Sequence, residues 1–122
     1  MSNEPIPCTV TILTRNSAAG LSRCLPGLKA FAEIIILDGD STDGTVAIAE
    51  TAGCRVLQQP PAALDDEGRL IDYSCARNRA IECATQPWVF TIDSDETISP
   101  ALVDELRCVL LAEPHPDIGA FD

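Results

Sequence analysis

Residues Ile34-Ile-Ile-Leu-Asp-Gly-Asp-Ser-Thr-Asp-Gly-Thr45 give the strongest indication of the fold, because four aliphatic residues pass directly into a polar, glycine-containing loop. A short continuous aliphatic run is typical of a strand that is buried on both faces. A helical pattern follows at 42–52. We expect Ser41 or Thr42 to cap this helix, and Asp43 and Gly44 to shape the turn before it. The segment predicts one unit of a parallel α/β sheet.

Similar units precede and follow this segment along the chain. Further runs rich in aliphatic residues predict strands at 8–14, 54–58 and 88–92. Candidate helices lie at 17–30, 73–85 and 100–112. The alternation predicts a single Rossmann-like α/β domain with three α/β/α layers and a mainly parallel sheet.

Several local signals refine this prediction. Pro26-Gly27 should kink or split the first helix, Gly53 suits the end of the second, and Ser99 offers an N-cap before Pro100. The last helix is expected to bury one apolar stripe, formed by Leu102, Leu106, Val109 and Leu110.

Two further segments and two single residues complete the prediction. Residues 59–72 are expected to form one surface loop, and 117–122 to begin a further strand that is cut short. Trp88 is expected in the core because it starts a buried strand, and His115, between two prolines, in an exposed loop.

The composition is that of a globular protein with an aliphatic core, at 46% hydrophobic, 4% aromatic and 22% charged residues. A net charge of −11 argues against binding nucleic acid or an anionic membrane without a bridging cation. Any phosphate ligand is therefore expected to need a metal ion.

The six cysteines are expected to be reduced core thiols, because no pair has C-x-x-C spacing; disulfides are the alternative. The sequence contains neither a signal-peptide pattern nor a run of about 18 apolar residues that would span a membrane. We therefore predict a cytoplasmic location.

Polar clusters follow three predicted strands, at 14–16, 38–41 and 93–95. The carboxyl ends of parallel strands line one crevice, where ligands bind in α/β sheets. The alternative is that these residues only form turns and cap helices. Three clusters in equivalent positions favour a ligand site.

Asp93 and Asp95 are the candidate metal ligands. Two positions apart at the end of a buried strand, their side chains are expected to point to the same side. Carboxylates suit a hard cation such as Mg²⁺ or Mn²⁺, which would bridge to a diphosphate. An isolated Asp-x-Asp pair is weak evidence, but the preceding strand and the following capped helix strengthen it.

Four blocks together resemble family 2 glycosyltransferases. They are Thr9-Val-Thr-Ile-Leu-Thr-Arg-Asn16, the segment 34–45, Ala76-Arg-Asn-Arg-Ala80 and Phe90-Thr-Ile-Asp-Ser-Asp-Glu96. The resemblance covers roughly residues 8–112. It implies a GT-A fold and transfer of a sugar from a nucleoside diphosphate, favouring UDP, to a glycan or glycolipid acceptor, commonly with inversion at the anomeric carbon.

Carried over by position, the resemblance implies that Thr14, Arg15 and Asn16 border the nucleoside pocket and that Asp38 contacts the base. These residue types suit hydrogen bonding to a nucleoside.

At the diphosphate end, the resemblance implies that Arg77 holds the donor, that Asp93 lies near the ribose and metal, and that Asp95 ligates the metal. Arg77 could instead be a surface cation paired with a nearby acid.

The resemblance further implies that residues 1–122 are the N-terminal, donor-binding portion of an enzyme, with a truncated sheet and without the acceptor half. The general base is then expected downstream, so no catalytic residue is assigned, and Glu96 is not nominated. Self-association at the sheet edge, and peripheral association of the full-length protein with the cytoplasmic face of a membrane, are additional expectations.

Two alternatives come from other functional classes. A phospho-receiver domain would carry an acidic pair after its first strand and a lysine after its fifth. In this chain the first predicted strand ends in Thr-Arg-Asn, and the single lysine is Lys29, in the first predicted helix. A non-catalytic nucleotide-binding or assembly module would retain the roles of Asp38 and Arg77 without turnover.

Overall fold

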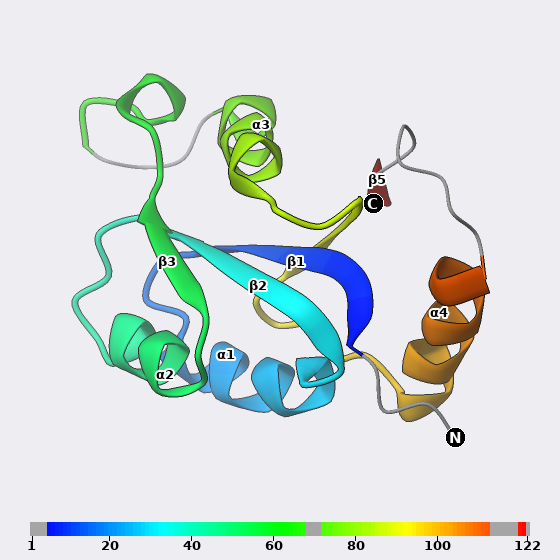
Figure 1. The fold of residues 1–122 in the computed structure, drawn as a ribbon. Helices are drawn as coiled ribbons and strands as arrows, with labels where there is room; N and C mark the ends of the chain where they lie inside the picture. Colours follow the sequence, from blue (N-terminus) through cyan, green and yellow to red (C-terminus); the bar gives the residue numbers. More distant parts are fainter. Residues whose placement is uncertain (1–4, 68–71, 113–119, 122) are drawn as a thin grey trace.

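The structure is a computed structural model that describes residues 5–67, 72–112 and 120–121 (Figure 1). In these residues the strands form one all-parallel sheet in the order β3-β2-β1-β4-β5. The strands are β1 (Ile6–Thr14), β2 (Phe31–Asp38), β3 (Arg55–Gln58), β4 (Trp88–Asp93) and β5 (Ala120–Phe121). The strand prediction is confirmed. β2 begins earlier than expected because Phe31 pairs with Ile6 of β1.

The described helices also lie close to the predicted positions. They are α1 (Ala18–Cys24), η1 (Leu25–Leu28, a 3₁₀ helix), α2 (Thr45–Thr51), η2 (Pro61–Ala63, also 3₁₀), α3 (Tyr73–Cys83) and α4 (Pro100–Ala112). The expected break at Pro26 is confirmed, since α1 gives way to η1 there. Gly53, at φ 84°, follows the end of α2. Ser99 Oγ accepts a hydrogen bond of 3.1 Å from the Leu102 N–H and so caps α4.

The second helix begins three residues later than expected. Neither Ser41 nor Thr42 caps it; the N-cap residue is Gly44, and Asp43 Oδ1 accepts a hydrogen bond of 2.9 Å from the Thr45 N–H. The loop before α2 stays non-helical because its N–H groups bond to side chains elsewhere at the carboxyl edge of the sheet. The prediction for Asp43 and Gly44 is confirmed, and the one for Ser41 and Thr42 is wrong.

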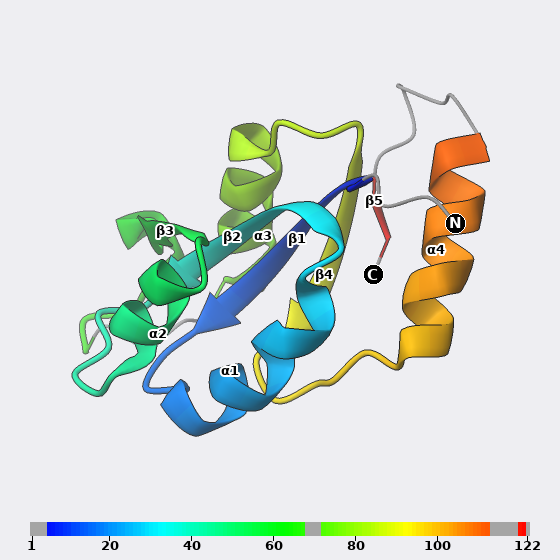
Figure 2. The ribbon, with the colours of Figure 1, turned by 60° about the horizontal axis from the view of Figure 1, so that its bottom comes forward.

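Helices cover both faces of the sheet, as Figures 1 and 2 show. α1, η1, α2 and α4 pack on one face, where the larger core cluster includes Ile12 and Ile36. α3 packs on the other, where Ala76 and Ala80 join a cluster with Leu37. Successive strand residues therefore face opposite layers. The predicted three-layer α/β/α architecture is confirmed.

The apolar stripe of α4 differs from the predicted one. Leu110 is buried and Val103 and Leu106 pack against the core, but Leu102 and Val109 are 37% and 47% exposed. Residues 103, 106 and 110 form a narrower stripe. This suits a helix that lies beside the β5 end of the sheet in Figure 1. No helix in the described ranges is long and apolar enough to cross a bilayer.

All six cysteines are free thiols. Cys8 and Cys24 are buried as expected, and burial raises the pKa of the Cys8 thiol to about 12. Cys108 is exposed, so its assignment to the core is wrong, because it lies on the outer side of α4.

Two other expectations concern burial. Trp88 is 6% exposed, which confirms its place in the core. The segment 59–72 is not a surface loop throughout, since Gln59 and Ala63 are buried. Residues 68–71 and His115 lie outside the described residues.

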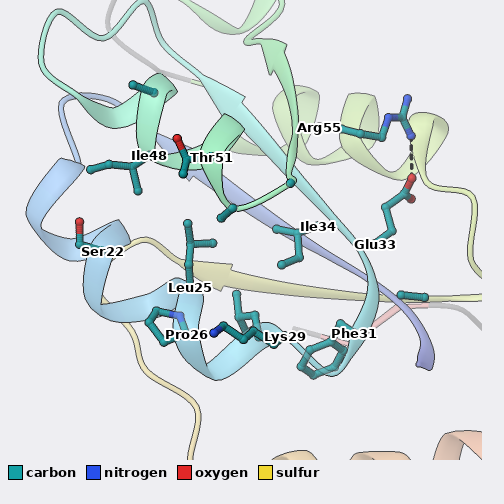
Figure 3. Close-up of a pocket in the computed structure, with 15 residues that line it drawn as sticks. Ser22, Leu25, Pro26, Lys29, Phe31, Glu33, Ile34, Ile48, Thr51 and Arg55 are labelled. Atoms are coloured by element: carbon teal, nitrogen blue, oxygen red, sulfur yellow. Dashed lines mark hydrogen bonds and ion pairs between the residues drawn. The ribbon is translucent and has the colours of Figure 1, made fainter. Parts of the chain in front are cut away.

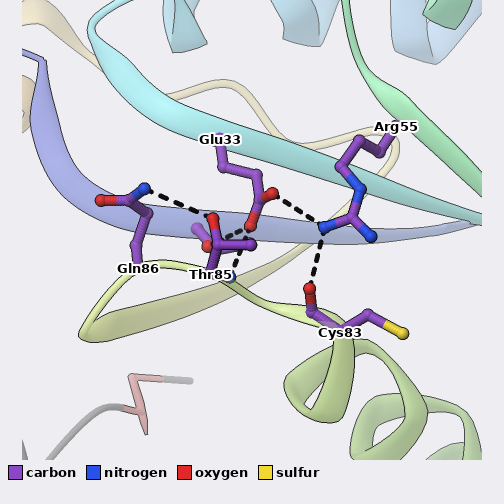
Figure 4. Close-up of polar contacts among 6 residues, drawn as sticks. Glu33, Arg55, Cys83, Thr85 and Gln86 are labelled. Carbon is purple, nitrogen blue, oxygen red and sulfur yellow. Dashed lines mark hydrogen bonds and ion pairs between the residues drawn. The ribbon is translucent and has the colours of Figure 1, made fainter.

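A polar network joins four segments toward the amino ends of the strands (Figure 4). Glu33 Oε2 forms an ion pair of 2.8 Å with Arg55 Nη1. Glu33 Oε1 accepts hydrogen bonds from the Thr9 hydroxyl (2.7 Å) and the Thr85 N–H (2.9 Å). Arg55 also donates to the Cys83 carbonyl at 2.8 Å. The network ties β1, β2 and β3 to the connection between α3 and β4.

We expect Glu33→Gln to destabilise the fold by about 1–3 kcal/mol at neutral pH, because an amide cannot replace every charge-assisted bond. Burial raises the pKa of Glu33, but hydrogen bonds from Thr85, Thr9 and Arg55 outweigh it, so the pKa lies below its usual value. The carboxylate's stabilising effect is therefore complete above the unfolded-state pKa, and it is lost as the pH falls through the lower folded-state pKa. Urea unfolding at several pH values measures this.

The matched control is Glu50→Gln, at an exposed position on α2. Its free energy of unfolding should change by less than about 0.5 kcal/mol. Equal effects of the two substitutions at neutral pH would contradict the proposed role of Glu33.

Candidate functional site

The three polar clusters meet at the carboxyl edge of the sheet. In the strand register Thr14 is paired with Asp38, Asp38 with Gln58, and Leu13 with Asp93. The ends of β1, β2 and β4 therefore lie side by side. This confirms that the three clusters converge.

Asp38 is 1% exposed, and hydrogen bonds surround its carboxylate. Oδ1 accepts from the Thr14 hydroxyl at 2.8 Å and from the Ser41 hydroxyl at 2.5 Å, and Oδ2 accepts from the Ser41 N–H at 2.8 Å. A buried carboxylate needs such donors to offset its desolvation. Asp38 therefore fixes the loop after β2 against the end of β1, and its predicted contact with a base stays a prediction.

Asn16 holds the same loop from the other side. Its φ of 49° places it in the left-handed region, which asparagine adopts more readily than most residues. Its Oδ1 accepts from the N–H groups of Thr42 (2.7 Å) and Asp43 (3.3 Å), and its own N–H donates to Ser41 Oγ at 2.8 Å. Arg15 and Asn16 are exposed at this edge, whereas Thr14 is buried.

Asp43 completes the link between the two loops. One carboxylate oxygen accepts from the Ala18 N–H at 3.1 Å, while the other accepts from the N–H and hydroxyl of Thr45. The Thr45 hydroxyl is the main cause of a lowered pKa for Asp43. The starts of α1 and α2 are thereby joined.

Gln59 is a site residue that the sequence interpretation missed. It is 6% exposed, and its Nε2 donates to the carbonyls of Thr14 (3.1 Å) and Leu37 (3.3 Å). Its Oε1 is buried without a partner and lies against Gly39, where an added Cβ would come within 2.8 Å of it. The available signal was that Gln59 also follows a strand at the carboxyl edge.

The acidic turn after β4, residues 93–96, leaves two of its carboxylates without partners among the described residues. The Glu96 N–H donates to the Asp93 carbonyl (3.0 Å), and the Asp93 N–H donates to Glu96 Oε1 (2.8 Å), which fixes Glu96 on the turn. Asp93 ends β4 and Asp95 lies in the turn, so the expected strand alternation does not extend to Asp95. Both residues are exposed, and neither carboxylate has a hydrogen bond or ion pair with any described residue.

The described ranges contain no group of three or more acidic, histidine or cysteine side chains that would enclose a metal ion. Asp93 and Asp95 supply two uncommitted carboxylates, whose oxygens are the atoms that Mg²⁺ and Mn²⁺ prefer. This donor set fits a cation that takes its remaining ligands from a bound molecule or water.

Arg77 lies on α3, with its Nε buried and without a hydrogen-bond partner. Within the described part of the chain it forms no ion pair, so the surface-pair alternative is not found there. A buried unpaired guanidinium N–H is costly, and an anion that reached it would relieve this cost.

A cavity of about 750 Å³ lies away from this edge, between α1, η1, α2 and the strands β2 and β3 (Figure 3). Leu25, Phe31, Ile34 and Ile48 line it. Lys29, Glu33 and Arg55 also line it, but it lies away from the strand ends where the three polar clusters meet, so it is not part of the candidate site.

Gly20 of α1 lies directly against the acidic turn. A Cβ on Gly20 would come within 2.8 Å of the Ser94 carbonyl oxygen and 3.5 Å of Asp95 Cα. Glycine to alanine usually stabilises a helix by about 0.5–1 kcal/mol. Here we expect Gly20→Ala to destabilise the protein by about 1–3 kcal/mol, because the contact is with backbone. Urea unfolding and the amide NMR shifts of Ser94 and Asp95 measure the effect.

Gly44→Ala is the matched control, because a Cβ added at Gly44 would meet nothing within 4 Å. It should leave the Ser94 and Asp95 shifts unchanged. The close contact is refuted if Gly20→Ala leaves them unchanged as well.

Comparison with known proteins identifies glycosyltransferases both by family profile and by sequence identity. A profile of Glycosyl transferase family 2 matches residues 9–115. The lipopolysaccharide core biosynthesis glycosyltransferase LpsC of Rhizobium meliloti is 34% identical over 119 residues, which is 93% of this chain and 40% of the relative.

Solved structures share the fold. A mannosyltransferase from Pyrobaculum calidifontis, in complex with GDP-Man and Mn²⁺, aligns with a TM-score of 0.62 and 22% identity over 91% of this chain and 33% of its own. Glucosyl-3-phosphoglycerate synthase from Mycobacterium tuberculosis, in complex with Mn²⁺, UDP and glucosyl-3-phosphoglycerate, aligns with a TM-score of 0.58 and 24% identity, over 88% and 40%. The chain thus spans less than half the length of these proteins. With the GT-A type of α/β sheet and a family profile that matches most of its residues, the chain belongs to glycosyltransferase family 2.

Proposed function

We propose that this chain binds a nucleoside-diphosphate sugar at the carboxyl edge of its sheet and serves as the donor-binding part of a transferase. The observation that carries the proposal is the pair of exposed, uncommitted carboxylates, Asp93 and Asp95, beside the ordered loops that Asp38 and Asn16 hold. The structural relatives bound to GDP-Man with Mn²⁺, and to UDP with Mn²⁺, support it.

Asp93 and Asp95 would hold the divalent cation, either Mg²⁺ or Mn²⁺. When bound, the cation supplies positive charge that offsets the charge of the diphosphate. A chain with a net charge of −11 otherwise repels such a ligand. Asp95 would be the principal ligand in this proposal, and Asp93 would lie near the ribose and the cation.

The nucleoside end of the donor would lie against Thr14, Arg15 and Asn16. Asp38 already accepts three hydrogen bonds, and a carboxylate has about four acceptor positions. One position on Oδ2 therefore remains for a base N–H. Because Asp38 is 1% exposed, only a group inserted tightly between the loops would reach it.

Arg77 would donate to the diphosphate. Its guanidinium carries several N–H donors in a planar arrangement that matches phosphate oxygens, and its Nε has no partner within the part of the chain that the structure describes. In the transfer reaction the bond between the anomeric carbon and the diphosphate oxygen breaks, and an acceptor hydroxyl attacks that carbon with inversion. Arg77 would stabilise the charge that develops on the leaving diphosphate.

The proton of the acceptor hydroxyl needs a general base, and we assign none within this chain. Glu96 is a poor candidate because its carboxylate accepts from the Asp93 N–H. We place the base, and most of the acceptor site, in the part of the relatives that this chain does not span. The similarity to a lipopolysaccharide core biosynthesis enzyme supports a glycan or glycolipid acceptor. We place the full-length protein at the cytoplasmic face of a membrane as part of the same proposal.

Calorimetric titration of UDP and GDP, each with and without Mn²⁺, tests the donor site. We expect metal-dependent binding, with UDP preferred, and a loss of at least about tenfold in affinity for Asp95→Ala. Asp104→Ala, at an exposed position on α4, is the control and should bind like the wild type. Folded wild-type protein that binds neither nucleotide would overturn the proposal.

A matched pair on α3 tests the diphosphate contact. Arg77→Ala should weaken UDP binding by at least about tenfold, because a charge-assisted hydrogen bond contributes about 1.5–3 kcal/mol. Arg79→Ala removes an exposed arginine of the same helix and should have little effect. Equal losses in the two variants, measured in the same titration, would instead indicate general electrostatic attraction.

A further inference from the structure

Tyr73 is an exposed aromatic residue at the first position of α3. It is 56% exposed, and it is the single tyrosine of the chain. Large aromatic side chains more often bury much of their surface, so its position calls for a physical explanation.

The path of the chain places this first turn at the carboxyl edge. The chain leaves β3 at its carboxyl end and enters β4 at its amino end, so α3 runs back across the sheet between them (Figure 1). The N-terminal turn of α3 therefore lies at the same edge as the ends of β1 and β2.

The periodicity of α3 gives the direction of the side chain. Tyr73, Ala76, Arg77 and Ala80 fall on one side of the helix, by the spacing of three and four residues. Ala76 and Ala80 are buried in the cluster that contains Leu37 of β2. Tyr73 precedes Ala76 by about 4.5 Å along the helix axis, toward the carboxyl edge. It is thus on the sheet-facing side but one turn further toward the strand ends, which accounts for its exposure.

The backbone at this turn is held in place. The Asp72 side chain caps α3 by accepting from the Cys75 N–H at 3.0 Å, and the Asp72 N–H donates to the Ala63 carbonyl at 3.1 Å. A capped and anchored first turn presents Tyr73 in a defined position.

Tyr73 and Arg77 together offer, one helical turn apart, an aromatic face and a planar cation whose Nε has no hydrogen-bond partner among the described residues. A molecule that carries a flat ring joined to an anionic group engages both, whereas a free sugar or a bare phosphate engages one. We propose that Tyr73 is a binding residue for the nucleobase of the donor, which stacks on its ring while the diphosphate lies toward Arg77. The inference rests on the proposed function and adds to it a residue outside the family motifs.

Calorimetry with UDP and with inorganic pyrophosphate, both with Mn²⁺, separates stacking from other effects. Tyr73→Ala should weaken UDP binding about tenfold, which is the size expected for one base stacked on one aromatic ring. Pyrophosphate has no base, so its affinity should stay the same. Tyr73→Phe keeps the ring and should bind UDP like the wild type. Ile81→Ala, at a position 42% exposed on the same helix, is the control and should change neither affinity.

The ultraviolet difference spectrum of the single tyrosine gives a second readout that needs no substitution. Stacking predicts a shift of its absorption on addition of UDP with Mn²⁺, and no shift with pyrophosphate. Equal UDP affinity of wild type and Tyr73→Ala, or equal loss of UDP and pyrophosphate binding, would overturn the stacking while leaving the donor site intact. Wild-type protein that binds neither ligand would overturn the proposed function and this inference with it.

Discussion

The buried carboxylate of Asp38 is the interaction on which the carboxyl edge of the sheet depends. It is 1% exposed and accepts hydrogen bonds from the Thr14 hydroxyl and from two groups of Ser41. A carboxylate buried without these donors would destabilise the fold by several kcal/mol. The loop after β2 must therefore keep the shape that supplies them, and α2 begins only at Thr45.

A second set of contacts extends this constraint across the edge. Asn16 and Asp43 join the loop after β1 to the loop after β2, and Gln59 fills the space between the strand ends beneath them. Most polar groups at the centre of the edge are therefore committed to one another, so the proposed ligand would meet a preformed surface. The uncommitted groups lie at its border, on the acidic turn after β4 and at the Nε of Arg77.

The order of strands and helices could be predicted because aliphatic runs and turn residues are local signals, and the parallel topology then brings the strand ends to one edge. The internal roles of Asn16 and Asp38 could not be predicted, because Asn16 bonds to residues 25 to 27 positions away and Asp38 bonds to Thr14, 24 positions away, so these contacts depend on strand register. Gln59 was missed because the two prolines after it indicate a loop, whereas its burial depends on the close approach of Gly39. In α4 the sequence allows two overlapping apolar stripes, the predicted one at 102, 106, 109 and 110 and the observed one at 103, 106 and 110. Only packing against the sheet selects the second.

Charged side chains are paired at one end of the sheet and unpaired at the other. Toward the amino ends of the strands, Glu33 and Arg55 form an ion pair with additional hydrogen bonds, and this arrangement leaves little capacity for an outside ligand. At the carboxyl edge, Asp93 and Asp95 stay exposed and without partners among the described residues, so their charges are free for the cation that we propose. The sheet therefore carries paired, stabilising charges on β2 and β3 at one end and unpaired carboxylates at the end of β4 at the other, where the proposed ligand would bind.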